Sequence, residues 1–235
     1  MSDVSALVIV PTYNERKNLP VVAAQLMQHP GVRLLVADDQ SPDGTGDVAD
    51  ALAREHRGRI DVLHRTGRRG LGRAYVDGFR IALGTSADVI CQMDADLSHD
   101  PAQLPSLLAA AATADLVLGS RYVPGGAIVN WPRHRQLLSR AANAYIRTVT
   151  RLPVRDCTTG YRCWRRETLA TLRLDRIVSE GYSFLIETLF MAARGGSRIA
   201  EVPIVFVERR QGQSKLSSAI LFESVMTPWR LIAGR

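Results

Sequence analysis

The sequence predicts an α/β protein with a mainly parallel central sheet and helices on both faces. Short apolar segments alternate with helical patterns through the first half of the chain. These segments are almost continuously apolar, as in parallel strands that are buried on both faces. A length of 235 residues with 46% hydrophobic content suits one domain with a sizeable core, or at most two small ones.

Five strands are expected in the first half, each a short apolar run that ends near polar residues. Helical patterns separate them, and the first helix opens at Asn18 with Pro20 just inside it. The expected strands are Ala6–Val10, Arg33–Ala37, Ile60–His64, Asp88–Met93 and Asp115–Ser120. The expected helices run to about Gln28, from the Ser41–Thr45 turn to about His56, from Leu71 to Leu83, and from Pro101 onward.

The second half of the chain is less regular. A basic stretch is expected to be helical from about Arg133 to Arg151. A helix around Tyr182–Ala193, a strand Ile199–Val207 and an apolar helix from Leu216 should follow.

The C-terminal segment carries an apolar stripe at helical spacing. Pro228 is expected to kink or split this helix. The stripe either packs on the domain core or lies on a membrane surface, where interfacial helices combine Trp, Phe and Leu with basic residues. Its members are Phe222, Val225, Met226, Trp229 and Ile232.

The composition restricts the partners and the compartment. A formal charge of +7 and a pI near 9.8 favour anionic partners, although basicity alone also serves solubility. Three cysteines without a CxxC pair argue against a disulfide framework or zinc site and fit a reducing compartment. With no signal peptide and no run of 18 apolar residues, we expect a cytosolic protein or one lying on a membrane surface.

Polar motifs follow four of the expected strands. They are "PTYNE" after the first, "DDQSPDGT" after the second, "DADLSHD" after the fourth and "SRY" after the fifth. In open parallel sheets, ligands bind beyond the carboxyl ends of the strands. The sequence therefore predicts a ligand site at this edge.

Asp94 and Asp96 alternate directly after the fourth strand, with the small Ala95 between them. Carboxylates at this spacing can both lean toward one ion, and oxygen ligands suit Mg²⁺ or Mn²⁺ bridging to phosphates. A loop of solvated acids is the alternative, since a lone DxD is common. The acids Asp38 and Asp39 at the neighbouring strand end favour the metal.

Basic residues supply the opposite charge. Arg209, Arg210 and Lys215 lie on a Gly-containing loop that is either solvated or a diphosphate clamp. The clamp is favoured by the acidic loop elsewhere, and an anion-binding rim would be completed by Arg121, Arg133 and Arg135. Asp39 could accept a hydrogen bond from a ribose hydroxyl or base. "GRRGLGRA" is not a P-loop and is interpreted as a tight helix entry, and His99 as a helix-entry cap rather than a catalytic residue.

The motifs resemble those of the polyprenol-phosphate (dolichol-phosphate) mannose synthases, inverting family-two glycosyltransferases with the GT-A nucleotide-sugar-binding fold. The resemblance runs from about Leu7 to Leu216 with the motifs in order. It rests on "VIVPTYNERKNLP", "DDQSPDGT", "GLGRAYVDGF", "MDADLSHDP", "GSRYVPGG", "DCTTGYR", "EGYSFLIE" and "RRQGQSKL".

The resemblance implies transfer of mannose from GDP-mannose to a polyprenyl (dolichyl-type) monophosphate, giving a β-mannosyl lipid that serves as mannose donor. A divalent metal, Mg²⁺ or Mn²⁺, is implied at Asp94, Asp96 and Ser98. The implied donor-binding residues are Pro11, Tyr13, Glu15, Ala37, Asp39, Asp94, Ala95, Asp96, Arg121, Arg209 and Lys215. Those implied for the acceptor are Arg133, Arg135 and Ser139, and those implied for catalysis are Asp94, Asp96, Arg121 and Arg135.

Two departures from the family pattern matter. The family often has Gln-His-Pro-Pro where this chain has Ser98-His99-Asp100-Pro101, and the shorter Ser98 leaves room for a water on the metal. Some relatives carry transmembrane helices after the catalytic domain. Here residues 1–215 are expected to form the GT-A domain and residues 216–235 a segment of C-terminal amphipathic helices. Contact with the cytosolic face of a membrane then comes from the chain itself or from a membrane-anchoring partner protein.

The predicted chemistry agrees with the residues present. A phosphate monoester is anionic at pH 7 and needs no strong base, so the task is to position two anions and stabilise the departing diphosphate. A UDP-glucose-dependent transferase onto the same lipid is the nearest alternative. A nucleotidyltransferase would want a glycine-rich basic loop after the first strand. A nucleic-acid-binding module would want more aromatic residues than the 6% present, so no nucleic acid partner is expected.

Overall fold

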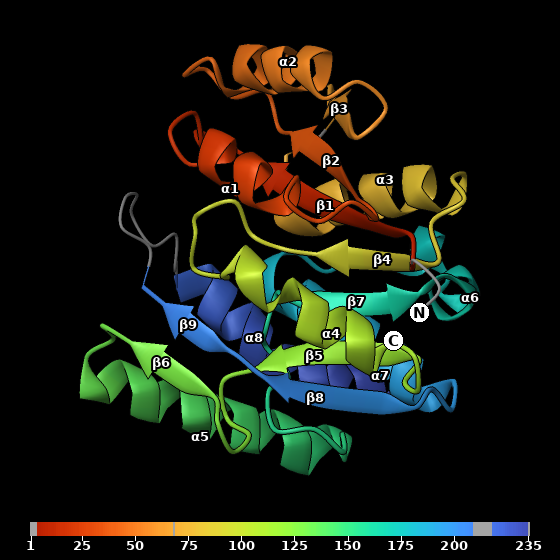
Figure 1. The fold of residues 1–235 in the computed structure, drawn as a ribbon. Helices are drawn as coiled ribbons and strands as arrows, with labels where there is room; N and C mark the ends of the chain where they lie inside the picture. The colour runs from red at the N-terminus through yellow and green to blue at the C-terminus, as the bar shows by residue number, and fades with distance from the viewer. Residues whose placement is uncertain (1–3, 68, 209–217, 235) are drawn as a thin grey trace.

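The computed structural model describes residues 4–67, 69–208 and 218–234, and a seven-stranded sheet forms its centre (Figure 1). The strand order is β3-β2-β1-β4-β7-β5-β8, and β7 pairs antiparallel with both of its neighbours. All five strands predicted in the first half are present, and the α/β fold with a mainly parallel sheet is confirmed. The strands are β1 (Ala6–Thr12), β2 (Val32–Asp38), β3 (Ile60–His64), β4 (Val89–Gln92), β5 (Leu116–Ser120), β7 (Arg162–Arg165) and β8 (Ile199–Pro203).

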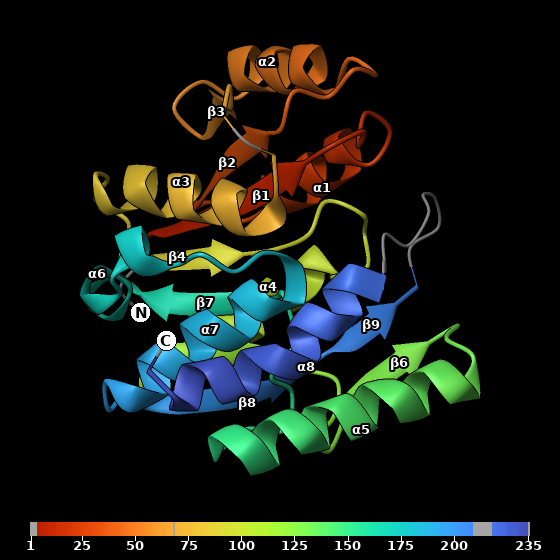
Figure 2. The same ribbon diagram turned by 180° about the vertical axis from the view of Figure 1, so that it is seen from behind.

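Helices cover both faces of the sheet, as Figures 1 and 2 show from opposite sides. One apolar core joins one sheet face to α1, α2 and α4, and a second joins the other face to α3, α6 and α7. The helices are α1 (Leu19–Leu26), α2 (Thr45–Glu55), α3 (Leu71–Leu83), α4 (Leu104–Ala110), α6 (Arg166–Thr171) and α7 (Gly181–Arg194). The helix predicted from Pro101 begins as a single 3₁₀ turn, Pro101–Gln103, before α4.

Strand β7 was not predicted, because its sequence Arg-Cys-Trp-Arg does not read as an apolar run. Arg162 is nonetheless fully buried. Its guanidinium donates to the carbonyls of Thr159, Leu185 and Cys157 at 2.9, 2.7 and 3.1 Å. Burial lowers the pKa of Arg162 to about 10, so the group stays charged at pH 7. The arginine thus fixes the loop before β7 and joins it to α7.

The predicted strand Ile199–Val207 is divided at Ile204. Its first part, β8, joins the main sheet beside β5, and β9 (Val205–Val207) pairs with β6 (Ala127–Val129) in a separate two-stranded sheet. Ile204 is fully buried and donates its N–H to the Ser120 carbonyl at 3.0 Å. This anchored bend carries the chain from the sheet core toward the loop after β5.

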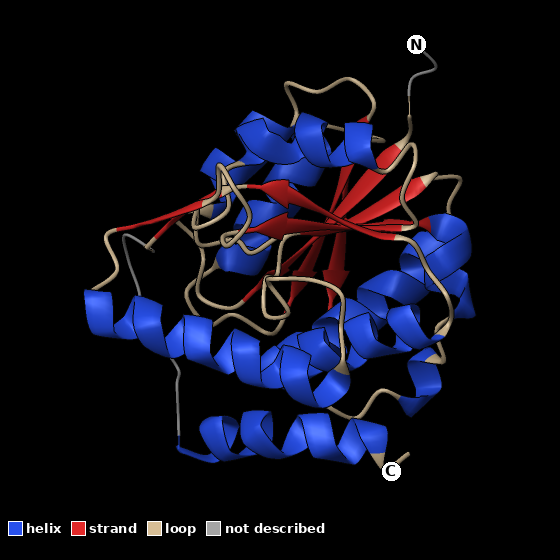
Figure 3. Ribbon diagram, turned by 90° about the horizontal axis from the view of Figure 1, so that it is seen from below, coloured by secondary structure: helices blue, strands red, loops and turns tan. Residues whose placement is uncertain are grey.

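Helix α8 (Ser218–Ile232) lies behind the sheet in the view of Figure 1, where it packs against α7 and α5 (Arg133–Thr150), and Figure 3 shows α5 and α8 from below. The Tyr145 hydroxyl of α5 donates to the Val225 carbonyl of α8 at 2.7 Å. Helix α8 is continuous through Pro228, so of the predicted kink or split only the split is contradicted. The predicted boundary at residue 215 lies outside the described residues.

Four residues of the apolar stripe of α8 have side chains that the structure describes, and these four are exposed. Val225, Met226, Trp229 and Ile232 are exposed, with exposed fractions of 52, 48, 53 and 48%. These four side chains are therefore not part of the core, whereas the adjacent Leu231 packs against it. Within the described parts of the chain, none of the helices combines the length and apolar character needed to cross a bilayer.

Candidate active site

The residues predicted for the nucleoside side of the donor meet at the carboxyl ends of β1 and β2. Pro11 and Ala37 are register partners in the two strands, and Tyr13 and Glu15 follow β1 directly. The Glu15 carboxylate accepts a hydrogen bond from Asn18 at 2.7 Å. The structure thus brings these four residues to one edge of the sheet.

Asp39 lies at the same edge and is nearly buried. Its carboxylate pairs with Arg65 and also accepts the Gly70 N–H at 2.9 Å, so it fixes the start of α3. The neighbouring Asp38 accepts from Thr12 and Ser41 and closes the turn after β2. Asp38 therefore organises the loop rather than contributing to the acidic cluster around Asp94.

The glycine-rich segment before α3 contributes a residue that sequence analysis did not assign. The Arg69 guanidinium lies over the Tyr13 ring, 4.9 Å from its centroid, and donates to the Tyr13 hydroxyl at 3.1 Å. It also donates to the Gln40 carbonyl at 3.1 Å. Arg69 thus closes one side of the nucleoside-facing edge.

The Asp94–Ser98 loop follows β4, which lies next to β1 in the sheet. Asp96 accepts the Ser98 N–H at 3.0 Å, and Leu97 between them adopts a left-handed φ of 61°. A bulky residue in that conformation is strained, and such strain is a feature of ligand-binding loops. The loop places Asp94, Ala95 and Asp96 beside the strand ends of β1.

The donor set at this loop fits a hard divalent cation. Asp94 and Asp96 supply carboxylate oxygens, and the buried Ser98 hydroxyl makes no hydrogen bond to any described residue. An orphaned buried hydroxyl is costly unless a ligand or water satisfies it. Within the described ranges, no three His, Cys, Asp or Glu side chains are grouped so that they could hold a metal ion among themselves. Such a metal would therefore take its other ligands from water and from the substrate phosphates.

His99 supports the same loop from inside the protein. It is fully buried between the rings of Tyr161 and Phe206, with centroids 5.2 and 5.5 Å away. Its Nδ1 accepts the Asp94 N–H at 3.3 Å, and burial lowers the pKa of His99. The prediction that His99 caps a helix is wrong, because Asp100 caps the following turn through Ala102 N–H at 2.9 Å.

Arg121 follows β5 and forms a buried ion pair with Asp156. Nε and Nη2 each donate to the carboxylate at 2.7 Å, and the main-chain N–H of Arg121 donates to it at 3.1 Å. Burial alone would lower the pKa of Arg121, but Asp156 outweighs this effect and raises it. Burial works to raise the pKa of Asp156, and Arg121 holds it below its usual value. Nη1 makes no hydrogen bond to the described chain.

Arg135 lies one turn into α5, next to Trp131. Its guanidinium is 4.0 Å from the Trp131 ring centroid and donates to Glu208 at 2.6 Å. One turn further along α5, Ser139 accepts from the Tyr122 hydroxyl at 2.6 Å. Arg133 is exposed at the start of the helix. Arg209 and Lys215 lie outside the described residues.

The arrangement is that of an α/β enzyme whose site extends along the carboxyl edge of its sheet, acidic at β4 and basic beyond β5. The chain matches Glycosyl transferase family 2 over residues 7–173 and belongs to that family. It is a glycosyltransferase.

Two curated proteins are similar over nearly the whole chain. The undecaprenyl-phosphate mannosyltransferase of Micrococcus luteus is 51% identical over 230 residues, covering 97% of this chain and 94% of the relative. The polyprenol monophosphomannose synthase of Mycolicibacterium smegmatis is 47% identical over 221 residues, covering 93% and 83%.

The fold resembles a solved glucosyl-3-phosphoglycerate synthase from Mycobacterium tuberculosis, in complex with Mn²⁺, UDP-glucose and phosphoglyceric acid. The TM-score is 0.71 at 20% identity, covering 98% of this chain and 80% of the other. This similarity supports the GT-A fold.

Replacing Asp156 by Asn should destabilise the protein by about 3–5 kcal/mol, since it leaves the buried Arg121 charge without its counter-ion. The control is Asp115→Asn, because Asp115 pairs with Arg198, whose side chain is 68% exposed. That exposed pair should cost less than about 1 kcal/mol. Urea unfolding of both variants measures the difference, and equal losses would contradict the assignment.

Proposed function

We propose that this glycosyltransferase moves mannose from GDP-mannose to a polyprenyl monophosphate and releases GDP. The observation that carries the proposal is the division of the site into an acidic and a basic half. The Asp94–Ser98 loop would lie on the donor side, with the donor-binding Arg121 after β5, and Arg135 on α5 would lie on the side expected for the acceptor. The two relatives described above support mannose as the sugar and a polyprenyl phosphate as the acceptor.

The transfer needs little covalent chemistry from the protein. An acceptor phosphate oxygen bonds to the anomeric carbon as the bond from that carbon to the β-phosphate oxygen breaks on the opposite face. Inversion follows, and the products are GDP and a β-mannosyl phosphodiester. The acceptor oxygen carries no proton at pH 7, so no general base is required.

Asp94, Asp96 and Ser98 would hold a divalent cation, Mg²⁺ or Mn²⁺, that neutralises the diphosphate as it leaves. Pro11, Tyr13, Glu15, Ala37 and Asp39 would position the nucleoside at the ends of β1 and β2. His99 supports the metal loop from inside the protein. Gly160 leaves room for the Asp94 carboxylate, since a Cβ at position 160 would lie 3.4 Å from its oxygens. Positioning and charge stabilisation are the terms that these residues supply.

Arg135 and Ser139 would receive the acceptor phosphate, with Arg133 nearby on α5. An arginine that stacks on Trp131 keeps its fork oriented for a phosphate. Arg121, held in place by Asp156 and by the rings packed around it, would attract a phosphate group through Nη1. Arg209 and Lys215 would complete the diphosphate clamp.

A polyprenyl acceptor requires the enzyme to work at a membrane surface, and we include a peripheral membrane contact in the proposal. The exposed stripe of α8, with Trp229 beside Arg230, is suited to the interface. All three cysteines are free and buried, which agrees with the cytosolic face. A membrane-anchoring partner protein would add to this contact.

The test is a transfer assay with labelled GDP-mannose and a short polyprenyl phosphate, with Mg²⁺, Mn²⁺ or chelator. We expect a β-mannosyl lipid product that forms only when a divalent cation is supplied. UDP-glucose is assayed in parallel as donor. Preferential use of UDP-glucose would contradict mannose as the transferred sugar. Product formation in the presence of chelator would contradict the requirement for a metal.

Asp96→Asn should reduce transfer by roughly 100- to 1,000-fold, because it weakens the charge that holds the diphosphate through the metal. The matched control is Asp100→Asn, whose amide oxygen retains the cap on the Ala102 N–H. The second readout is metal-dependent binding of the donor by calorimetry. Normal metal-dependent binding in Asp96→Asn would contradict the metal site.

Arg135→Ala should raise the KM for the acceptor roughly 10- to 100-fold, the range for losing a charged hydrogen bond, while the donor KM stays within about twofold. Glu208→Gln should act in the opposite direction and lower the acceptor KM by up to about fivefold, since it frees Arg135 from a half-exposed partner. An equal change in the donor KM would contradict this assignment and indicate that Arg135 binds the nucleotide donor.

A further inference from the structure

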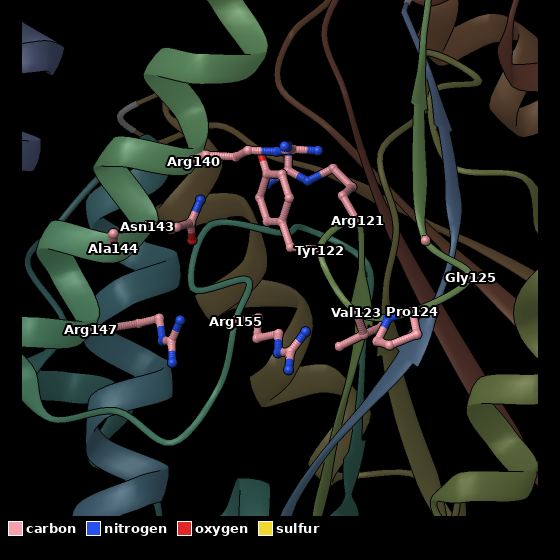
Figure 4. Close-up of a pocket in the computed structure, with 11 residues that line it drawn as sticks. Arg121, Tyr122, Val123, Pro124, Gly125, Arg140, Asn143, Ala144, Arg147 and Arg155 are labelled. Carbon is pink, nitrogen blue, oxygen red and sulfur yellow. The ribbon is translucent and has the colours of Figure 1, made fainter.

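A basic pocket borders the strand-end site at Arg121 and lies between α5 and the loop after β5. It encloses about 680 Å³ and is lined by Arg121, Arg140, Arg147 and Arg155. We call it the arginine pocket. Figure 4 shows Arg147 extending from α5 toward Arg155, which projects toward the loop that carries Val123 and Pro124.

Three of the four arginines have no carboxylate partner among the described residues. Arg121 is neutralised by Asp156. Arg140, Arg147 and Arg155 form no ion pair within the described part of the chain, and Arg140 lies over the Tyr122 ring at 5.9 Å. The adjacent Glu201 is engaged by the main-chain N–H groups of Arg155 and Asp156 at 2.7 and 2.9 Å.

Like charges gathered in one cavity repel one another and favour a bound anion. The planar guanidinium group can donate two parallel hydrogen bonds to one phosphate group. A phosphate in the arginine pocket would relieve this repulsion, whereas no carboxylate is present among its lining residues.

The helix that supplies the pocket also has features of an interfacial helix. Arg133, Arg140 and Arg147 are spaced by seven residues, so they form one stripe along α5. Leu137 and Leu138 are 69 and 64% exposed, and Ala141 and Ala144 are exposed as well. Interfacial helices combine exposed apolar side chains with basic residues that reach the headgroups.

We propose that the arginine pocket binds the phosphate of an anionic phospholipid headgroup when α5 lies on the membrane. The inference rests on the proposed function only in that a lipid acceptor brings the enzyme to a bilayer. Arg121 and Tyr122 line the pocket, and Tyr122 contacts Ser139. A headgroup held there would therefore orient the enzyme with its acceptor side toward the lipid surface.

The experiment measures vesicle binding by flotation of the full chain, without donor or metal. Vesicles of phosphatidylcholine alone are compared with vesicles that also contain phosphatidylglycerol. The double variant R147A/R155A should bind the anionic vesicles roughly 30-fold more weakly, since each arginine near such a surface is worth about a fivefold change in partition. Added salt should narrow the difference by screening.

The matched control is R54A/R57A, which removes the same charge from a pocket at α2 and β3, where Asp50 and Asp61 also line the wall. These residues lie at the other end of the sheet from α5 (Figure 1). Its binding should stay within about twofold of wild type. The single variants R147Q and R155Q, each expected to lose about fivefold, provide the same test should the double variant fail to fold.

Two further arms distinguish the source of the phosphate. Inorganic phosphate is added as a competitor, and neutral vesicles containing a short polyprenyl phosphate replace the anionic ones. Specific loss of binding to phosphatidylglycerol vesicles supports the headgroup site. Wild-type binding of R147A/R155A to phosphatidylglycerol vesicles overturns it. It is also overturned if the variant loses only its binding to polyprenyl phosphate vesicles, or only its sensitivity to competing inorganic phosphate. The transfer assay is independent, so failure of the proposed function shows there and not in flotation.

Discussion

The buried pair of Arg121 and Asp156 is the interaction on which the structure beyond the end of β5 depends. Asp156 accepts from both the side chain and the main chain of Arg121, so it fixes the exit of β5 against the loop that leads into β7. The rings of Tyr122, Trp131 and Phe206 pack around the guanidinium at 5.3 to 5.8 Å. The ends of β5 and β9 and the start of α5 are thereby held together.

The same aromatic cluster reaches the donor side. Phe206 contacts His99, and His99 receives the N–H of Asp94. A chain of packed rings therefore connects the acidic loop after β4 to the arginines beyond β5. If the proposed transfer takes place here, two anionic groups must approach each other, and this connection would set the distance between their binding sites. Burial disfavours the charged imidazolium and lowers the pKa of His99.

The sequence predicted the parts of this structure that depend on local pattern. Strands β1 to β5 are continuous apolar runs, and their ends carry the polar residues, so both the sheet and its functional edge could be expected. It did not predict β7, whose buried Arg162 donates to carbonyls of the loop before the strand and of α7. The sequence likewise did not predict the counter-ions of Arg121 and Arg135. Asp156 and Glu208 lie 35 and 73 positions away in the chain, and only the fold brings them together.

Some missed residues did leave a signal. The spacing of seven between Arg133, Arg140 and Arg147 marks one face of α5, although Arg155 joins them only through the loop after the helix. Arg69 lies in a glycine-rich segment interpreted only as a helix entry, and its position over Tyr13 depends on how that segment folds back across β2.

Exposure ranks the arginines by how readily each can exchange its protein partner for a phosphate. The side chains of Arg121 and Asp156 are 5 and 0% exposed, and separating them would leave a buried charge without compensation. Arg135 and Glu208 are 27 and 35% exposed, where an ion pair contributes little net free energy. Arg135 can therefore release Glu208 for a phosphate at small cost, whereas Arg121 keeps Asp156 and acts as a fixed wall. Arg147 and Arg155 have no such partner to release within the described chain, so an anion gains their full attraction. Under the proposed function, a lipid phosphate would therefore meet first the arginines at the exposed rim, which have the least to give up in binding it.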